Sequence, residues 1–380
     1  MKITFVAPDS GCAWWRIKQP AKMIERLGLA EVRYFDIQTM HPDDFEEMIE
    51  WGELIVMQSA MGVKTVASVI RMKELGKTVI GDYDDLSFTL SPFNPAYKTL
   101  GLSEVWIDVH KDGEKLWLWK DNERGFSLEA NKLRYQSLQH LLTILDGVTV
   151  TTPFIKNEYF RYTPEIFILP NSIDFNLFKP FPKEKHEQIR IGWTASDSHY
   201  AEFWMIVRIM RKLFDKYGKR IRFVLLGNLY ELKKHFSNDE LECHEFIGLN
   251  TYPLKLASLS LDIGLCPLVE NEFNKAKSQL KWSEFSALEI PCVCSRLQPY
   301  DCVENGITGM IGNNEEEFYN SLCELIENPP LRDKISSNAY TKNYEDYNLE
   351  KNVLLWMDVY EQIMDKANGI LIKPSESIIV

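Results

Sequence analysis

Short apolar runs alternate with helix-forming stretches along the first part of the chain, and this alternation constrains the fold more than any other feature. Each run has the composition of a buried strand, and helical patterns such as Val63–Leu75 lie between the runs. An order of strand, helix and strand predicts a parallel sheet with its ligands at the carboxyl ends of the strands. The expected strands are Lys2–Ala7, Glu31–Phe35, Leu54–Gln58 and Thr78–Gly81.

The same pattern restarts after a linker, ILPNSIDFNLFKP, whose Pro170 and Asn171 favour turns. The strands expected beyond it include Ile189–Trp193, Phe223–Leu226, Glu245–Ile247 and Gly309–Ile311. Because 380 residues exceed the usual single core, we expect two domains. The predicted class is α/β, with two Rossmann-like, doubly wound parallel-sheet domains facing a central cleft.

The predicted domain boundaries follow from these patterns. The first domain spans residues 1–170, with an aromatic-rich insertion at about 91–131 that breaks the strand–helix rhythm. Its aromatic side chains could stack on sugars or bases, or serve only for packing. The second domain spans 171–345, and 346–380 holds a helix expected to cross back to the first domain, followed by a tail.

Composition and charge narrow the classes of partner. The formal net charge of −12 argues against a protein that binds nucleic acid through its overall field, although a local basic groove stays possible. The first residues lead directly into a strand pattern, and no apolar stretch approaches the length of a membrane span. With seven scattered cysteines, which suit reduced thiols, the sequence predicts a cytoplasmic protein.

The stretch from Asp262 to Ser295 predicts a strand, a loop, a helix and a second strand. The loop offers hydrogen-bond donors that suit a phosphate. A lysine and a carboxylate follow on about one face of the helix, and the carboxylate suits a ribose. A solvated charged face is the alternative. The residues concerned are Asn274, Lys275, Lys277, Ser278, Lys281 and Glu284, and Ser196 lies at another strand-to-helix turn that suits phosphate.

The loop after the first strand, PDSGCAWWR, supplies two further candidates. Gly11 permits close approach of the backbone to a ligand. Arg16 could reach a phosphate or a sugar hydroxyl, because guanidinium donors match both. The structural alternative is that Arg16 stacks on Trp14 or Trp15.

Three acids, Asp82, Asp84 and Asp85, cluster where the strand Thr78–Gly81 is expected to end. They could ligate a divalent cation, hold sugar hydroxyls or position an acceptor. A helix N-cap with solvated charge is the structural alternative.

Several motifs together resemble a known family. LPNSID, LDIGLCPL, FNKAKSQLKWSEFSALEIPCVCS and YDCVENGITGMI resemble the C-terminal half of GT-B glycosyltransferases of the family 4 type, the glycosyl transferases group 1. SGCAWWRIKQPAKMI and GDYDDL are similar to elements of a bacterial and phage branch. The resemblance implies transfer of a sugar, with retention, from a UDP- or GDP-sugar to an acceptor hydroxyl, without a tightly bound metal.

The resemblance also implies a division of labour, with the donor on the second domain and the acceptor on the first. The expected acceptor is a glycan or glycolipid, and a hydroxylated DNA base is the alternative. A sugar-nucleotide epimerase and a noncatalytic sugar-nucleotide-binding protein are the alternative functions. The oligomeric state stays open.

Residue by residue, Glu284 matches the glutamate that holds the donor ribose. The family's second glutamate is replaced by Ala276, and its phosphate-binding Arg–Lys pair is absent from GWTASDSHYAEF. The expected catalytic residues are Arg16, Asp84, Lys277 and Lys281. The expected donor-binding residues are Gly11, Ser196, Asn274, Lys275, Ser278 and Glu284, with Asp82 and Asp85 as contacts to sugar or acceptor.

Overall fold

The computed structural model describes residues 1–109, 115–182, 184–228 and 230–370, so most of the tail lies outside the described residues. The chain divides into two compact units, each built from separate segments. Unit 1 comprises Met1–Asp84, Lys132–Pro170 and the segment that begins at Leu349, and unit 2 comprises Asp85–Asn131 and Asn171–Asn348.

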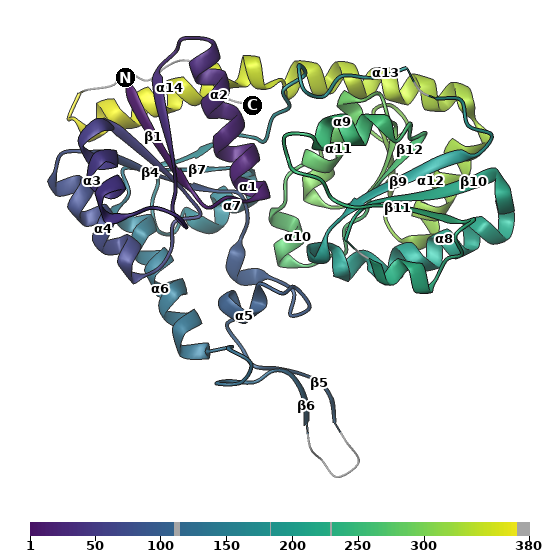
Figure 1. The fold of residues 1–380 in the computed structure, drawn as a ribbon, viewed down its shortest axis with the longest axis horizontal. Helices are drawn as coiled ribbons and strands as arrows, with labels where there is room; N and C mark the ends of the chain where they lie inside the picture. The colour runs from purple at the N-terminus through teal and green to yellow at the C-terminus, as the bar shows by residue number, and fades with distance from the viewer. Residues whose placement is uncertain (110–114, 183, 229, 371–380) are drawn as a thin grey trace. The chain divides into compact units, whose positions relative to one another are not determined.

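Unit 1 is built on a six-stranded, all-parallel sheet in the order β2-β1-β3-β4-β7-β8 (Figure 1). The strand order reverses between β1 and β3, and the carboxyl ends of strands at such a point form a ligand crevice. The strands are β1 (Lys2–Ala7), β2 (Glu31–Asp36), β3 (Leu54–Gln58), β4 (Thr78–Tyr83), β7 (Gly147–Val150) and β8 (Ile166–Ile168). The helices around this sheet include α1 (Gly11–Ala13), α2 (Gln19–Arg26), α3 (Pro42–Trp51), α4 (Val63–Glu74), α6 (Leu128–Ile144) and α7 (Pro153–Tyr159).

The core of unit 1 includes the final helix, α14 (Leu349–Ala367). Trp356 and Tyr360 of α14 are buried with Phe5 of β1 and Ile17. A Cβ atom added at Gly147 would lie 2.5 Å from the side chain of Ile363, so the helix packs closely on β7. The first strands and the last helix therefore share one hydrophobic core.

Unit 2 contains a second six-stranded, all-parallel sheet in the order β11-β10-β9-β12-β13-β14. Its strand order reverses between β9 and β12, the point at which a dinucleotide fold binds its ligand. The strands are β9 (Ile189–Ala195), β10 (Ile221–Gly227), β11 (Leu241–His244), β12 (Ile263–Cys266), β13 (Cys292–Ser295) and β14 (Met310–Gly312). The α-helices are α8 (Phe203–Tyr217), α9 (Tyr252–Ser258), α10 (Glu272–Ala276), α11 (Leu280–Ala287), α12 (Glu315–Glu327) and α13 (Pro329–Asp346).

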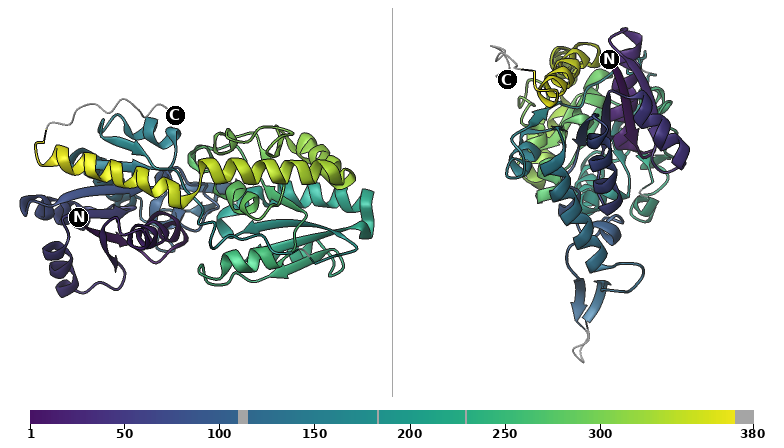
Figure 2. Two further views of the ribbon diagram at one scale, coloured as in Figure 1. Left: turned by 90° about the horizontal axis from the view of Figure 1, so that it is seen from above. Right: turned by 90° about the vertical axis from the view of Figure 1, so that its left-hand side faces the viewer.

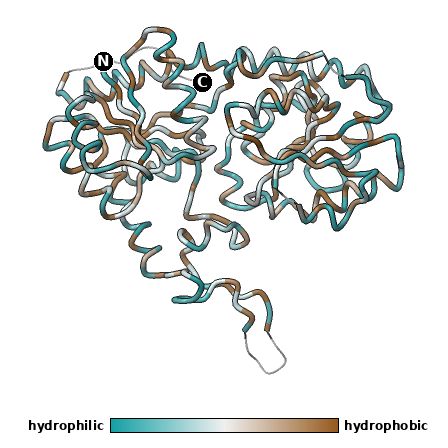
Figure 3. The backbone as a smooth tube through the Cα atoms, viewed as in Figure 1, coloured by the Kyte–Doolittle hydropathy of each residue, from teal (hydrophilic) through white to brown (hydrophobic). Residues whose placement is uncertain are grey.

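Hydrophobic residues follow the central strands of both units in Figure 3. The two parallel sheets confirm the predicted pair of doubly wound domains. One strand prediction was wrong: β11 lies at Leu241–His244, whereas Glu245–Ile247 is irregular. None of the described helices is long and apolar enough to cross a bilayer.

The aromatic-rich insertion, which was predicted as part of the first domain, belongs to unit 2 by its contacts. The reason is a small core in which Leu90, Tyr97 and Phe126 pack with Phe273 of α10. From this core an antiparallel hairpin of β5 (Val105–Val109) and β6 (Lys115–Trp119) projects as an arm (Figures 1 and 2). The insertion also holds the short helix α5 (Tyr97–Leu100).

Candidate functional site

A lysine lies at the strand reversal of unit 2. Lys281 extends from α11, and its Nζ donates a hydrogen bond of 2.6 Å to Oγ1 of Thr194, near the carboxyl end of β9. The same Nζ lies 3.8 Å from Oε2 of Glu284, one helical turn further along α11. A positive charge and a carboxylate therefore meet where this sheet architecture binds its ligands.

Glu284 is held in place from two sides. It is buried, and its Oε2 accepts a hydrogen bond of 2.8 Å from the hydroxyl of Tyr252 on α9. Burial raises the pKa of the Glu284 carboxyl, while the charge of Lys281 and the hydrogen bond from Tyr252 act in the opposite direction. The carboxylate is thus oriented before any ligand arrives.

The backbone packs closely at the carboxyl ends of β9 and β10. The last residue of β10 is Gly227, with φ of +147°, and a Cβ atom there would lie 1.7 Å from the carbonyl oxygen of Ala195. Only glycine permits this approach and this backbone conformation. Ser196 follows Ala195 directly and is exposed, as a phosphate contact requires.

The loop between α10 and α11 is hydrogen-bonded to Asn171, the first residue of the second segment of unit 2. Oγ of Ser278 accepts a hydrogen bond of 2.9 Å from Nδ2 of Asn171, and Nε2 of Gln279 donates to the carbonyl of Asn171 at 2.8 Å. Lys277, directly after α10, places its ammonium over the ring of Phe273 at 5.1 Å from the centroid. Lys275 is instead paired with Glu272 of its own helix at 2.9 Å.

In unit 1, Arg16 is fully buried in a π-helical turn, Trp14–Lys18, between α1 and α2. Its Nε and Nη2 donate to the two carboxylate oxygens of Asp82, at 3.0 and 2.6 Å. Nη1 donates to the carbonyl of Leu169 at 2.5 Å, and the guanidinium lies over the ring of Trp356 at 4.7 Å.

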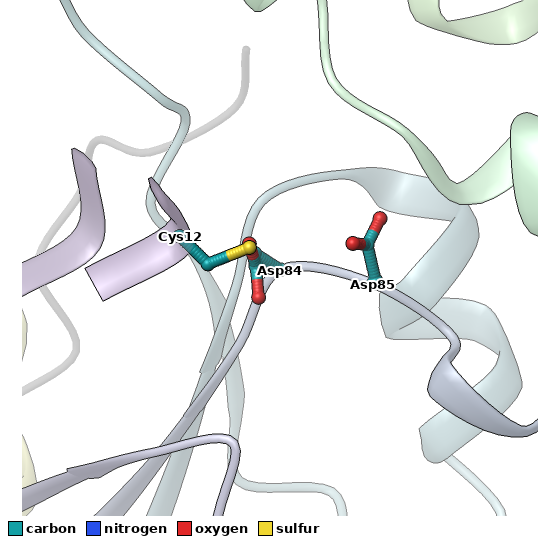
Figure 4. Close-up of side chains that lie close together, drawn as sticks. All are labelled: Cys12, Asp84 and Asp85. Carbon is teal, nitrogen blue, oxygen red and sulfur yellow. The ribbon is translucent and has the colours of Figure 1, made fainter. Parts of the chain in front are cut away.

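Asp84 follows β4 directly and is half-buried beside Cys12. Its Oδ1 accepts a hydrogen bond of 3.1 Å from Nε2 of Gln58. Burial raises the pKa of the Asp84 carboxyl, while a hydrogen bond from the Cys12 thiol lowers it. Figure 4 shows the Cys12 sulfur beside the Asp84 carboxylate, and it also shows Asp85, the next residue along the chain. Gly11, just before Cys12, is exposed, with nothing within 4 Å of a Cβ added there.

Comparison with solved structures identifies the architecture. A sucrose-phosphate synthase from Thermosynechococcus elongatus superposes with a TM-score of 0.66 at 12% identity, over 96% of this chain and 100% of that one. The chain has the GT-B fold. A glycosyltransferase from Rickettsia africae ESF-5 gives a TM-score of 0.64 at 12% identity, over 96% of this chain and 98% of that one.

A third similar structure contains UDP-glucose. Alr3699/HepE from Anabaena, in complex with UDP-glucose, gives a TM-score of 0.62 at 12% identity, over 97% of this chain and 100% of that one. The predicted resemblance to GT-B enzymes is confirmed at the level of the fold. No protein-family model and no curated protein matches the sequence.

The contacts of Arg16 and Asp82 in the structure differ from those expected. Arg16 was expected to act on the diphosphate and Asp82 to contact sugar or acceptor, but both side chains are fully buried and bonded to each other. Asp82 lies inside β4, which extends beyond its predicted end, and its Oδ2 also accepts from the hydroxyl of Thr149 at 2.7 Å. Removal of either partner would leave the other as a buried charge without a counter-ion.

The amide of Asn274, expected to contact the donor, is bonded to other parts of unit 2. Its buried amide Nδ2 donates to Oε1 of Glu202 at 2.7 Å and to the carbonyl of Val269 at 2.8 Å. The sequence did not predict roles for Glu202, Thr194 and Tyr252. The carboxylate of Glu202 is 1% exposed and also accepts a hydrogen bond from the backbone N–H of Val269, so it holds the loop after β12 in place.

His199 lies beside this cluster, with its Nδ1 3.7 Å from Oε2 of Glu202. Burial and the charge of Lys277 lower the pKa of His199 to about 4, although the nearby carboxylate of Glu202 opposes the shift. The imidazole is therefore neutral at pH 7. The sequence signal was weak, since a histidine at a helix start is usually a cap or exposed.

We expect His199 to make the protein less stable in acid. Its ordinary pKa of 6.5 falls to about 4 on folding, so the unfolded chain binds a proton more readily than the folded one between these pH values. The contribution of His199 to the free energy of unfolding is therefore fully present above pH 6.5 and is lost as the pH falls toward 4. The loss is about 3 kcal/mol, at 1.36 kcal/mol per unit of pKa. Urea unfolding at pH 7, 5.5 and 4 should show a smaller decline for His199→Gln than for wild type. Equal declines in the two proteins would contradict this assignment.

Proposed function

We propose that the protein is a glycosyltransferase that moves a sugar from a nucleoside diphosphate sugar to an acceptor hydroxyl. The observation that carries the proposal is the group of Lys281, Thr194 and Glu284 at the strand reversal of unit 2. A cation there suits a diphosphate, and an oriented carboxylate suits the paired hydroxyls of a ribose. The UDP-glucose in the Anabaena structure of the same fold supports this choice of ligand.

The proposed chemistry places positive charge on the leaving group. As the glycosidic bond breaks, the nucleoside diphosphate gains negative charge and the anomeric carbon gains oxocarbenium character. Lys281 and Lys277 are proposed to stabilise the diphosphate, together with the hydroxyl of Ser196. Glu284 holds the ribose, and transfer proceeds with retention. Arg16 is not assigned to this step, because its side chain is fully buried and donates to Asp82 and Leu169.

The acceptor is proposed to be a glycan or glycolipid bound by unit 1. Asp84 is half-buried at the carboxyl end of β4, next to the strand reversal of that unit, where its carboxylate can accept a hydrogen bond from an acceptor hydroxyl. The donor is a UDP- or GDP-sugar.

A two-stage assay tests the proposal. Binding of UDP, GDP and their glucose, galactose and N-acetylglucosamine derivatives is first measured by calorimetry, with wild type and Lys281→Ala in parallel. Release of free nucleoside diphosphate is then followed with and without oligosaccharide or glycolipid acceptors. We expect release that requires an acceptor, and a product whose anomeric proton coupling matches that of the donor.

The other outcomes would each replace the proposal. Interconversion of sugar nucleotides without an acceptor would identify an epimerase. Binding without turnover across the whole panel would identify a noncatalytic binding protein. Transfer to hydroxymethylated DNA but to no glycan would retain the transferase and overturn the acceptor class.

A further inference from the structure

We propose that His199 is a further contact for the diphosphate of the donor, and that it binds this group in its protonated form with the Glu202 carboxylate as counter-ion. The inference rests on the proposed sugar transfer and adds a residue to its donor site. His199 lies in a short 3₁₀ segment, Asp197–Glu202, which follows the carboxyl end of β9. Thr194, near that end of β9, contacts Lys281, so the segment begins at the strand reversal where such sheets bind ligands.

His199 is the basic residue of this segment, because the sequence of residues 196–202 contains no lysine or arginine. Lys277 and Lys281 come from a different part of unit 2, directly after α10 and within α11. Both lysines lie close enough to His199 for their charges to act on it. Three basic side chains from two separate segments therefore gather near the end of β9, as recognition of an anion with several negative charges requires.

Glu202 is placed to act as the counter-ion of a charged imidazole. Its Oε1 accepts hydrogen bonds from Nδ2 of Asn274 and from the backbone N–H of Val269, and its Oε2 lies 3.7 Å from Nδ1 of His199. That Nδ1 is buried and has no hydrogen-bond partner among the described residues, which is unfavourable for a ring nitrogen. With a proton on both nitrogens, Nδ1 can donate to Glu202 after a small shift, and Nε2 remains as the donor to a ligand. The side chain is 14% exposed, so the ring is open to such a ligand.

The donor itself has to bring about the protonation. In the free protein, burial and the charges of Lys277 and Lys281 hold the pKa of His199 at about 4, against the opposing charge of Glu202. A bound diphosphate adds negative charge beside the same lysines and offsets their effect on the imidazole. Donor binding therefore raises the pKa of His199, takes up a proton from solvent and forms a charge-assisted hydrogen bond. The proton returns to solvent when the nucleoside diphosphate leaves.

Calorimetry with sugar nucleotides measures this proton uptake on the full chain. UDP-glucose and GDP-mannose are suitable probes, because both of their phosphates are esterified and lack the ionisation near pH 6 of a terminal phosphate. Each titration is carried out at pH 6 in two buffers with different heats of ionisation, and the difference in binding heat gives the number of protons taken up. We expect uptake of at most one proton by wild type. Its affinity should rise by up to about tenfold per pH unit as the pH falls from 7.5 to 5.5.

Three variants assign the proton to His199. His199→Gln keeps a polar side chain that cannot be protonated, so it should bind without uptake, independently of pH and about tenfold more weakly at pH 6. Glu202→Gln keeps an oxygen for Asn274 and Val269 but removes the counter-ion, and it should take up less of a proton than wild type. His186→Gln, at an exposed histidine before β9, should match wild type.

The outcomes separate this inference from the proposed function, and the measurement on wild type is decisive even where a variant does not fold. Binding of a sugar nucleotide without proton uptake, or uptake that is unchanged in His199→Gln, would overturn the role of His199 and leave sugar transfer standing. Absence of binding by every sugar nucleotide of the panel would overturn the donor site and His199 with it.

Discussion

Asp82→Ala is expected to lower the free energy of unfolding by about 3–5 kcal/mol, because it leaves a buried guanidinium without its counter-ion. Arg16 and Asp82 are both fully buried, and two parallel hydrogen bonds join them. Arg16 also contacts Leu169 and Trp356, which lie far from it in the sequence. Loss of the carboxylate therefore weakens the junction of all three segments of unit 1.

The measurement is urea unfolding of the purified variant, followed by the fluorescence of the buried tryptophans. The matched control is Glu47→Ala, which removes the partner of Arg33 in an ion pair whose side chains are 42% and 59% exposed. This change should lower stability by no more than about 1 kcal/mol. Similar losses in the two variants would show that burial does not set the strength of the Arg16–Asp82 pair.

A double substitution separates loss of the pair from loss of packing. Arg16→Met with Asp82→Leu removes both charges and keeps apolar volume, and such replacements of buried pairs are often neutral or stabilising. The double variant should be more stable than Asp82→Ala. If it also keeps wild-type transfer activity, Arg16 is structural, whereas a large loss of activity in a stable double variant would return Arg16 to the catalytic residues.

Lys281→Ala is expected to reduce kcat/KM for sugar transfer by about 10²-fold or more, the effect of removing one donor that stabilises developing negative charge. The half-buried ammonium contacts Thr194 and lies near Glu284, so it is fixed at the strand reversal before the donor binds. Stability should change far less, by about 1 kcal/mol, since the lost hydrogen bond is a single one.

Steady-state kinetics with the donor identified by the binding panel measure this effect. Lys281→Arg keeps the charge and should retain more activity than Lys281→Ala. Lys234→Ala removes a lysine whose side chain is 69% exposed and paired with Glu231, and it should behave as wild type. Transfer by Lys281→Ala at the wild-type rate would reject the assignment of this lysine to the diphosphate.

The sequence predicted the sheets well because buried parallel strands are continuous apolar runs. β1 and β3 match their expected limits, and β9 and β10 differ by a few residues at one or both ends. The failure at β11 has a physical reason. Its sequence, LECH, carries a charge and lies at the edge of the sheet, whereas the apolar signal came from the next residues, where Phe246 is 53% exposed.

Side-chain roles were harder to predict because they depend on partners distant in sequence. Nothing near Arg16 indicates that Asp82, 66 positions later, fills its donors. The amide of Asn274 donates to Glu202, 72 positions earlier. From the sequence alone, an asparagine in a loop beside lysines looks the same whether it contacts a ligand or a distant residue. Lys281 and Glu284 were predictable as a pair because one helical turn separates them, and their spacing alone brings them together.

The packing of α14 has a consequence for biosynthesis. The core that joins Phe5 and Ile17 to Trp356 and Tyr360 cannot close until the ribosome has released a helix encoded more than 330 residues later. Unit 2 reaches its last strand and helices before that point, so it can form first while the opening strands wait with an unfilled apolar face. During that interval the apolar surface of the first strands stays exposed, which makes this segment prone to aggregation.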